Sequence, residues 1–339
     1  MFWRVVQAFG ASSAMSVGAG VIGDIYRLEE RGYAMGLFFG ASLLGPAIAP
    51  LCGGLAAHYG SWRYMQWALF VMGITAIISM ALWLPETLDP EKLNKVKVEG
   101  KTVLKVLNPL ASLTLLRSPA ILVVTLAGTT ALLADWVLMV PLSYTVGEAY
   151  GISNAAIIGA LFIPLGVGNM VGAPLAGYLS DRAIIVWRER RGGVWVPEDR
   201  LRAAIWGTAF CVPVSTLAAG LTMKYVPGLP GIAILLVCLF LNGVGVDIVL
   251  TPSASYYVDI LHDRSAEAMA ASFACRALIL AFATAWTFPL INTIGVLATN
   301  TLLALIAWLG YGMILFTIKY GDHMRAWVDI GYTTSRDTC

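Results

Sequence analysis

The sequence has little charge for its length. Asp, Glu, Lys and Arg make up 12% of its 339 residues, whereas soluble globular domains carry about 25%. Hydrophobic residues account for 58%, the mean hydropathy is +0.77, and low-complexity tracts are absent. These values exclude an ordinary soluble domain and a disordered or fibrous chain. A net charge of +2 is too small to indicate a nucleic-acid partner, so a polytopic membrane protein is the class that remains.

Cysteine and histidine are also scarce. The chain has five cysteines and three histidines, and no two cysteines have C-x-x-C spacing. We therefore predict neither disulfides nor a metal site, and no other cofactor. An enzyme is not expected either, because His58 is followed by Arg63 where an H-x4-D site needs its acid. Met1 leads directly into an apolar segment without a basic region or a cleavage site, so no removable signal peptide is predicted.

Long apolar runs are what the sequence has in abundance. A bilayer core of about 30 Å requires roughly 20 apolar residues per helix. Such runs lie at residues 2–24, 32–57, 62–84, 120–144, 152–178, 203–224, 230–251, 266–289 and 294–318. The sequence therefore predicts an all-α polytopic membrane protein with nine transmembrane helices.

Lysine and arginine are unevenly distributed between the loops. If the segments 25–31, 85–119, 179–202 and 252–265 and the tail after 318 share one side, that side holds 18 of the 22 basic residues. The loops on the opposite side hold none. The positive-inside rule then predicts that the long loops and the C-terminus are cytoplasmic. With an odd number of spans, the N-terminus is expected outside.

Motifs in the first two spans resemble those of a known transporter family. The first span contains Arg4-x-x-Gln7, which resembles the fourth helix of major facilitator superfamily transporters. The second span is similar to the antiporter motif of that superfamily, above all in its fungal drug:proton antiporter branch, with Ala49 in place of a glycine. Its Gly-Pro and Gly-Gly pairs are separated by six residues rather than two. The motif positions are Gly36, Gly40, Gly45, Pro46, Pro50, Gly53 and Gly54.

The resemblance continues in the second half of the chain. The run Gly177-Tyr-Leu-Ser-Asp181-Arg182 resembles the degenerate G-x-x-x-D-R loop between the eighth and ninth helices of the family. The segments 197–201 (PEDRL), 258–259 (VD) and 265–267 (SAE) also look like the fungal antiporter branch. Each motif alone is only moderately specific for the family, whereas the order of the motifs along the chain is a strong indication of it.

Taken over the whole chain, the resemblance implies a major facilitator superfamily fold that lacks its first three helices. Residues 1–84 are then expected to be the second half of the N-terminal helical bundle, and 85–119 the central cytoplasmic loop. The range 120–318 is expected to form the C-terminal six-helix bundle, and 319–339 a cytoplasmic tail.

The function that the resemblance implies is proton-coupled efflux. An antiporter of this branch exports small organic molecules such as drugs, polyamines or secondary metabolites across the fungal plasma membrane, by alternating access. Its expected partners are the lipid bilayer, protons and a small-molecule substrate. The alternative is a truncated, non-transporting pseudotransporter, or a fragment produced by a wrongly started gene model.

Two features are candidates for gating. Gly45, Ala49 and Gly53 recur every four residues, which favours close helix packing, and prolines at 46 and 50 remove backbone donors and bend a helix. Plain close packing without a gating role is the alternative. Asp181 and Arg182 are predicted to form a conformational latch at the inner end of a helix, or else to belong to a solvated turn.

Buried polar residues are candidates for proton or substrate contacts. Arg4 lies in an apolar segment, where an arginine is costly unless it finds water or a partner, with Gln7 one turn away; a snorkelling Arg4 is the alternative. Asp135 lies in an apolar run that disfavours its charged form, which indicates a proton carrier or a contact for a cation, or a packing hydrogen bond.

The remaining polar residues inside the spans are predicted to hold helices together. Asp247 and Arg276 are further candidates for proton or substrate contacts, and they are expected to pair with each other or with cytoplasmic groups in a structural or gating salt bridge. Asn169 and Asn242 are expected to form hydrogen bonds between helices.

Overall fold

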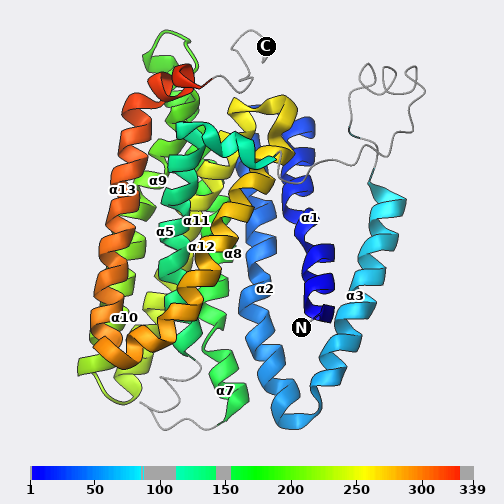
Figure 1. Cartoon of the computed structure of the whole chain (residues 1–339), viewed down its shortest axis with the longest axis vertical. Helices are drawn as coiled ribbons and strands as arrows, with labels where there is room; N and C mark the ends of the chain where they lie inside the picture. Colours follow the sequence, from blue (N-terminus) through cyan, green and yellow to red (C-terminus); the bar gives the residue numbers. More distant parts are fainter. Residues whose placement is uncertain (1, 85–86, 88–111, 143–153, 329–339) are drawn as a thin grey trace.

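The computed structural model describes residues 2–84, 87, 112–142 and 154–328 of the chain. Within these residues the chain forms helices and turns, and no strand is present. Nine helices in this part of the chain are long and apolar enough to cross a membrane, as the hydropathy pattern predicts. They run side by side along the longest axis of the molecule (Figure 1), an arrangement that lets each helix satisfy its own backbone hydrogen bonds in lipid.

Three helices come from the N-terminal part of the chain and the rest form one bundle. The N-terminal helices are α1 (Phe2–Ile25), α2 (Arg31–Tyr59) and α3 (Trp62–Trp83). The bundle contains η1 (Ser112–Arg117), α5 (Pro119–Pro141), α7 (Ala155–Ala160), α8 (Ile163–Arg190), η3 (Pro197–Arg202), α9 (Ala204–Trp206), η4 (Gly207–Cys211), α10 (Val212–Tyr225), α11 (Leu229–Ile260), η5 (His262–Arg264), α12 (Ser265–Ile294) and α13 (Val296–Trp327).

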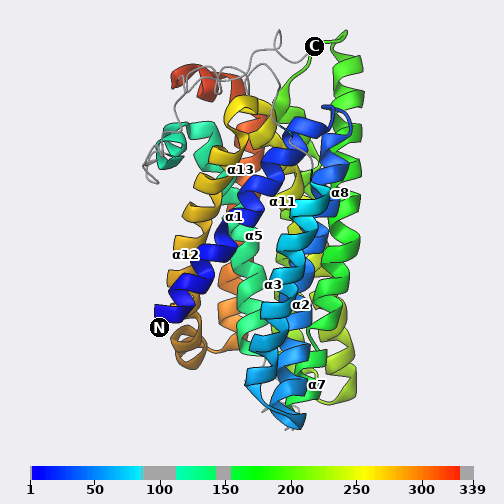
Figure 2. The same ribbon diagram turned by 90° about the vertical axis from the view of Figure 1, so that its right-hand side faces the viewer.

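The N-terminal helices meet the bundle through α1 and α2. Helix α2 packs along α8 and α7, and α1 packs against α12. Helix α1 leans across the bundle, and its buried residues (Ala19, Gly20 and Gly23) all lie near its C-terminal end (Figure 2). Helix α3 lies at the edge of the molecule beside α2 and has no buried residue (Figure 1).

One end of the molecule collects the basic turns. The turns at 26–30, 191–196 and 261–264 all lie at the top of Figure 1, and we call this end the basic end. Helix α11 is the central element there, because every residue from Gly245 to Ile260 is buried. Contacts made at this end therefore join α11 to the helices around it.

Several helices continue beyond their predicted ends. Helices α8, α11 and α13 reach Arg190, Ile260 and Trp327, inside the ranges 179–202, 252–265 and 319–339 that were predicted as loops and tail. Hydropathy marks where the apolar surroundings end, whereas polar residues continue a helix without difficulty. The predicted loop 85–119 lies mostly outside the described residues, but its last part forms η1, in which Leu115 is buried.

A proline explains the irregular turn between η3 and α10. The five residues of η4 form a π-helical turn just before Pro213. Proline has no backbone N–H, so the carbonyl group of Ala209, four residues earlier, loses its helical partner. The indole Nε1 of Trp308 on α13 donates a hydrogen bond of 3.0 Å to this oxygen. A side chain from a neighbouring helix thus satisfies a backbone group that lipid would leave unpaired.

Candidate functional site

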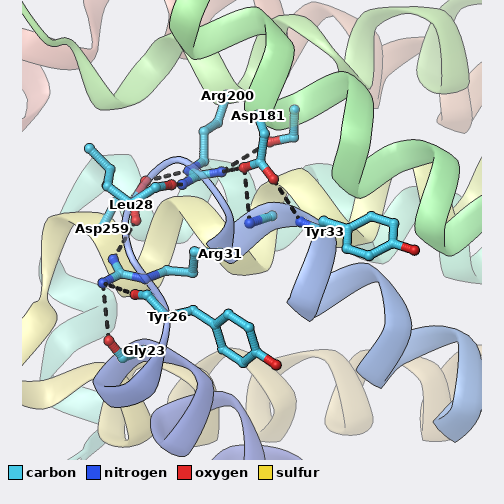
Figure 3. Close-up of polar contacts among 10 residues, drawn as sticks. Gly23, Tyr26, Leu28, Arg31, Tyr33, Asp181, Arg200 and Asp259 are labelled. Atoms are coloured by element: carbon cyan, nitrogen blue, oxygen red, sulfur yellow. Dashed lines mark hydrogen bonds and ion pairs between the residues drawn. The ribbon is translucent and has the colours of Figure 1, made fainter.

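Four charged residues at the basic end form a continuous set of ion pairs. We call Arg31, Asp181, Arg200 and Asp259 the basic-end network (Figure 3). Arg31 Nη1 contacts Asp259 Oδ1 at 2.7 Å, and Arg200 Nη1 contacts Asp181 Oδ1 at 2.8 Å. Arg200 Nε also donates to the second oxygen of Asp259. These residues come from α2, α8, η3 and α11, so the network links an N-terminal helix to the bundle.

The network also holds the turn between α1 and α2. Arg31 Nη2 donates to the carbonyl oxygen of Gly23 at 3.0 Å, and Arg200 Nη2 donates to that of Leu28 at 2.6 Å. Asp181 accepts hydrogen bonds from the backbone N–H groups of Gly32 (3.0 Å) and Tyr33 (2.8 Å). These groups lie at the N-terminus of α2, where unpaired N–H donors and the helix dipole favour a carboxylate.

Burial makes this network energetically important. The side chains of Arg200 and Asp259 are both 0% exposed. Two cations and two anions balance each other, and backbone groups take part of the remaining hydrogen-bonding capacity. Removing one member of a buried ion pair typically costs about 3–5 kcal/mol, because the partner is left as an uncompensated charge. The network is therefore stable only while α2, α8, η3 and α11 keep their present positions.

The two residues before Arg200 anchor η3 to the bundle. Glu198 contacts Arg325 of α13 at 2.7 Å and accepts a hydrogen bond from the Tyr256 hydroxyl at 3.2 Å. Asp199 pairs with Arg191 at the end of α8 and with Arg202. Glu198, Asp199 and Arg200 thus contact different parts of the bundle, and the contacts of the first two fix the position of Arg200.

A nearby surface ion pair provides a contrast. Arg188 Nη1 lies 3.3 Å from Glu29 Oε1, but the two side chains are 41% and 59% exposed. Exposed pairs contribute little because water and salt screen them. We expect Arg188→Ala to change the free energy of unfolding by less than about 0.5 kcal/mol, measured by thermal unfolding in detergent. A loss of unfolding free energy as large as that expected for a buried network residue would contradict the view that the exposed pair contributes little.

The structure places one of the two predicted latch residues in the network. Asp181 is buried within it, whereas Arg182 is exposed and has no ion-pair partner among the described residues. The arginine that pairs with Asp181 is Arg200 instead. Arg31, Arg200 and Asp259 were not predicted as site residues. Arg200 and Asp259 lie in the segments that carry the family resemblance, but nothing in their spacing indicates that they meet.

Close backbone contacts between α2 and α8 lie beside the network. A methyl group built on Gly36 would overlap the carbonyl group of Ala173, with the carbonyl carbon at 2.9 Å. One built on Gly40 would lie 3.2 Å from the Ala173 side chain, and one on Gly177 would lie 2.8 Å from the carbonyl carbon of Gly32. Small residues at four-residue spacing therefore let the two backbones touch.

The later glycines of the predicted motif in α2 do not take part in this contact. Gly45 is exposed, and nothing lies within 4 Å of a methyl group built on Gly45 or Gly53. The close face of α2 follows positions 32, 36 and 40, while positions 45 and 53 lie on another face of the helix. Towards the other end, Pro50 has its carbonyl oxygen 2.5 Å from a methyl group built on Gly159 of α7. Pro46 lies within α2 and Gly54 is half-buried.

Two carboxylates lie inside the bundle, away from the network. Asp247 of α11 is 0% exposed and Asp135 of α5 is 9% exposed. Neither oxygen of Asp247 has a hydrogen-bond partner within the described part of the chain, and Oδ1 of Asp135 also has none. Ala134 and Val246, which directly precede Asp135 and Asp247, pack in one hydrophobic cluster. The two carboxylates, which were predicted separately, therefore lie beside the same cluster.

A pair between Arg276 and Asp247 was one of the expected arrangements, but the structure gives Arg276 a different partner. Its Nη2 donates to the hydroxyl of Tyr257 at 3.4 Å, and that hydroxyl shares a hydrogen bond of 3.0 Å with Thr125. These residues link α12, α11 and α5. Asn242 behaves as predicted, since its Nδ2 donates to Ser215 of α10 at 3.1 Å.

Arg4 and Gln7 lie outside this arrangement. Both are exposed on the N-terminal half of α1, which contributes no buried residue. The structure brings neither of them into contact with Asp135, Asp247 or Arg276.

Comparison with known proteins identifies the family. The sequence model of the family described as the Major Facilitator Superfamily matches residues 1–284 of this chain. The chain belongs to the major facilitator superfamily. It is therefore a multi-pass membrane protein of a transporter family rather than of an enzyme family.

Curated relatives of this chain are fungal transporters. It is 27% identical over 332 residues to the transporter paaT of Penicillium rubens, a match that covers 89% of this chain and 58% of paaT. It is 27% identical over 350 residues to the MFS transporter OpS2 of Beauveria bassiana, covering 94% of this chain and 98% of OpS2. Citrate exporter 1 of Aspergillus niger is 33% identical over 206 residues, covering 53% of this chain and 39% of the exporter. The chain thus spans little more than half of paaT but nearly all of OpS2.

Proposed function

We propose that this protein is a proton-coupled efflux transporter of small organic molecules, working by alternating access in a fungal plasma membrane. The observation that supports this proposal is the basic-end network, a buried and charge-balanced contact between an N-terminal helix and the bundle. Such a contact is formed completely or broken completely, as an alternating-access gate requires. The fungal transporters among its relatives favour the same function.

The proposed cycle opens and closes the basic end. In the present structure, the network and the α2–α8 contact at Gly36 and Gly177 hold this end closed. Opening requires Arg31 and Arg200 to leave Asp259, and Asp181 to leave the N-terminus of α2. A substrate or proton moves this equilibrium only by binding one state more tightly than the other. Since the basic end is predicted to be cytoplasmic, the proposed cycle assigns this arrangement to a state closed towards the cytoplasm.

The substrate class rests on the family resemblance and on the relatives. The resemblance implies drugs, polyamines or secondary metabolites, and organic acids are a further candidate because one relative is named as an exporter of citrate. Arg4 and Gln7 are proposed contacts for a substrate or a proton, because an arginine within a membrane segment needs a polar partner.

Proton coupling can be tested without knowing the natural substrate. The purified full chain is reconstituted into liposomes that contain the pH-sensitive dye pyranine. Rhodamine 6G, spermidine and citrate are then added outside in separate runs. An antiporter exchanges internal protons for the added compound, so we expect at least one probe to make the interior more alkaline. Liposomes without protein are the control and should show no change.

Two results would contradict the proposal in different ways. Uptake of a probe without any change in internal pH would show transport that is not proton-coupled. Neither uptake nor a pH change with any of the probes would favour the alternative, a non-transporting member of the family.

A further inference from the structure

Helix α11 carries a row of buried polar side chains without partners. Asp247, Thr251 and Ser255 follow one another at four-residue spacing, and all three are 0% exposed. Both oxygens of Asp247 and the hydroxyl oxygens of Thr251 and Ser255 have no hydrogen-bond partner in the described residues. A buried polar group without a partner costs about 1–3 kcal/mol. A run of them along one helix therefore points to a ligand that the polypeptide itself does not supply.

The surroundings of Asp247 are mainly apolar or made of backbone. Val244 and Gly243 lie three and four residues before it, on the same side of α11. Val244 lies against Gly172 of α8, and Gly243 lies against the Leu165 carbonyl group and the side-chain oxygen of Asn169. Val246 and Leu250 belong to a hydrophobic cluster that also contains Ala131 and Ala134 of α5. Asp135 follows Ala134 directly. The two carboxylates therefore lie beside the same hydrophobic cluster, and within the described part of the chain no donor reaches Asp247.

No cation from the described residues compensates Asp247. The charged side chains on α2, α8 and η3, and Arg276 on α12, either have partners elsewhere or are exposed. Those with partners are Arg31, Asp181, Arg188, Glu198, Asp199, Arg200, Arg202 and Arg276, and the exposed ones are Arg182, Glu189 and Arg190. On η5 and at the start of α12, Arg264 pairs with Glu267. Helices α1 and α10 carry charged side chains only at exposed positions, namely Arg4, Asp24 and Lys224. Asp135, the buried carboxylate of α5, instead places a second acid beside the same hydrophobic cluster.

We propose that Asp135 and Asp247 form a proton-binding pair within the bundle, and that Thr251 and Ser255 connect this pair to Asp259 at the basic end. Two neighbouring carboxylates in an apolar site cannot both remain ionised, so one of them binds a proton. The protonated carboxyl group is neutral, which removes the repulsion between the two. This step needs no further reagent, because the proton comes from water and returns to water.

The row continues into the basic-end network. Asp259 follows Ser255 by four residues and accepts hydrogen bonds from Arg31 and Arg200. Successive positions lie about 6 Å apart along the helix axis, which is too far for direct contact between hydroxyl groups. The proposed path needs a bridging water at each step to complete the hydrogen bonds. Along this path a proton would pass between the pair and Asp259.

This inference extends the proposed function and explains how the proton is coupled to the gate. While Arg31 and Arg200 hold Asp259, the row ends at an ion pair and a proton on the acid pair cannot leave at the basic end. When the network opens, Asp259 becomes accessible to water and the proton is released there. Proton release would thus depend on the same contacts that close the transporter.

The acid pair can be tested by infrared spectroscopy on the purified full chain in nanodiscs, with no substrate present. The carbonyl stretch of a protonated carboxyl group should appear at a pH at which exposed aspartates are ionised. We expect Asp247→Asn and Asp135→Asn each to remove this band. Asp24→Asn is the matched control, because Asp24 is exposed, and it should leave the band intact. A band that persists in both buried variants would overturn the proposal.

Two further tests ask whether the acid pair binds a proton rather than another cation, and whether the proton moves through Thr251 and Ser255. If adding sodium at fixed pH removes the band, the pair binds a small cation in preference to a proton, and the proposal is wrong. In an Arg200→Ala background, in which the network is broken, the band should respond fast to a rapid pH change, and adding Thr251→Val or Ser255→Ala should abolish this response. Ser253→Ala is the control on the same helix, since the Ser253 hydroxyl already donates to the carbonyl oxygen of Val249. An unchanged response in the two path variants would contradict the path.

These outcomes are independent of the transport assay. A protein that transports a probe with coupled protons but lacks the band would keep the proposed function and exclude the acid pair. A protein that shows the band but moves no probe would have the proton site without the proposed function.

Discussion

Replacing Arg200 by alanine is expected to open the basic end and to destabilise the closed state by about 3–5 kcal/mol. Arg200 is fully buried and contacts Asp181, Asp259 and the carbonyl group of Leu28. Its removal leaves two buried carboxylates with fewer donors and frees the turn that leads into α2. Arg200→Lys should have a smaller effect, because lysine keeps the charge but cannot reach these partners through separate planar nitrogens.

The opening can be measured as a distance. Spin labels at Glu30→Cys and Glu189→Cys, in a background without the native cysteines, report the separation of α2 from α8 by pulsed electron resonance. Both residues are exposed, so labelling should not disturb the core. We expect Arg200→Ala to shift the distribution to longer distances, while Arg188→Ala leaves it unchanged. An unchanged distribution in Arg200→Ala would show that the network does not hold this end closed.

The number of helices was predictable from the sequence because crossing a membrane is a local requirement. Each span needs its own apolar run, and the nine runs correspond to nine suitable helices within the described residues. The helix ends were less predictable. Polar segments such as the one ending at Arg190 look like loops by hydropathy, although they continue a helix and are held there by ion pairs such as Asp199 with Arg191.

The site was only partly predictable because its residues meet through tertiary structure. Asp181 was recognised from a local motif, but its partner Arg200 lies 19 residues later, and Arg31 and Asp259 are 228 residues apart. The choice between neighbouring charged residues, Arg182 or Arg200, depends on how η3 folds back over the helix ends. In contrast, the four-residue spacing of Asp247, Thr251 and Ser255 is visible in the sequence once the second half of α11 is known to be buried all round.

Gly36 is expected to be far more sensitive to substitution than Gly45, although both lie in α2 and in the segment that resembles the antiporter motif. A methyl group at position 36 meets the Ala173 carbonyl group of α8, which is backbone and cannot turn away. At position 45 it meets nothing within 4 Å. Both Gly→Ala changes favour the helix equally, by up to about 1 kcal/mol. The difference between them therefore isolates the contact between the helices.

We expect Gly36→Ala to lower the free energy of unfolding by about 1–3 kcal/mol, the usual cost of overpacking, and Gly45→Ala to be neutral or slightly stabilising. Thermal unfolding in detergent measures both, and the spin-label pair on α2 and α8 shows whether the Gly36 variant also opens the basic end. Equal effects would mean that α2 does not pack on α8 through this face. A large loss at Gly45 alone would instead place the functional close contact of α2 on the face that is exposed here, where the sequence motif first indicated it.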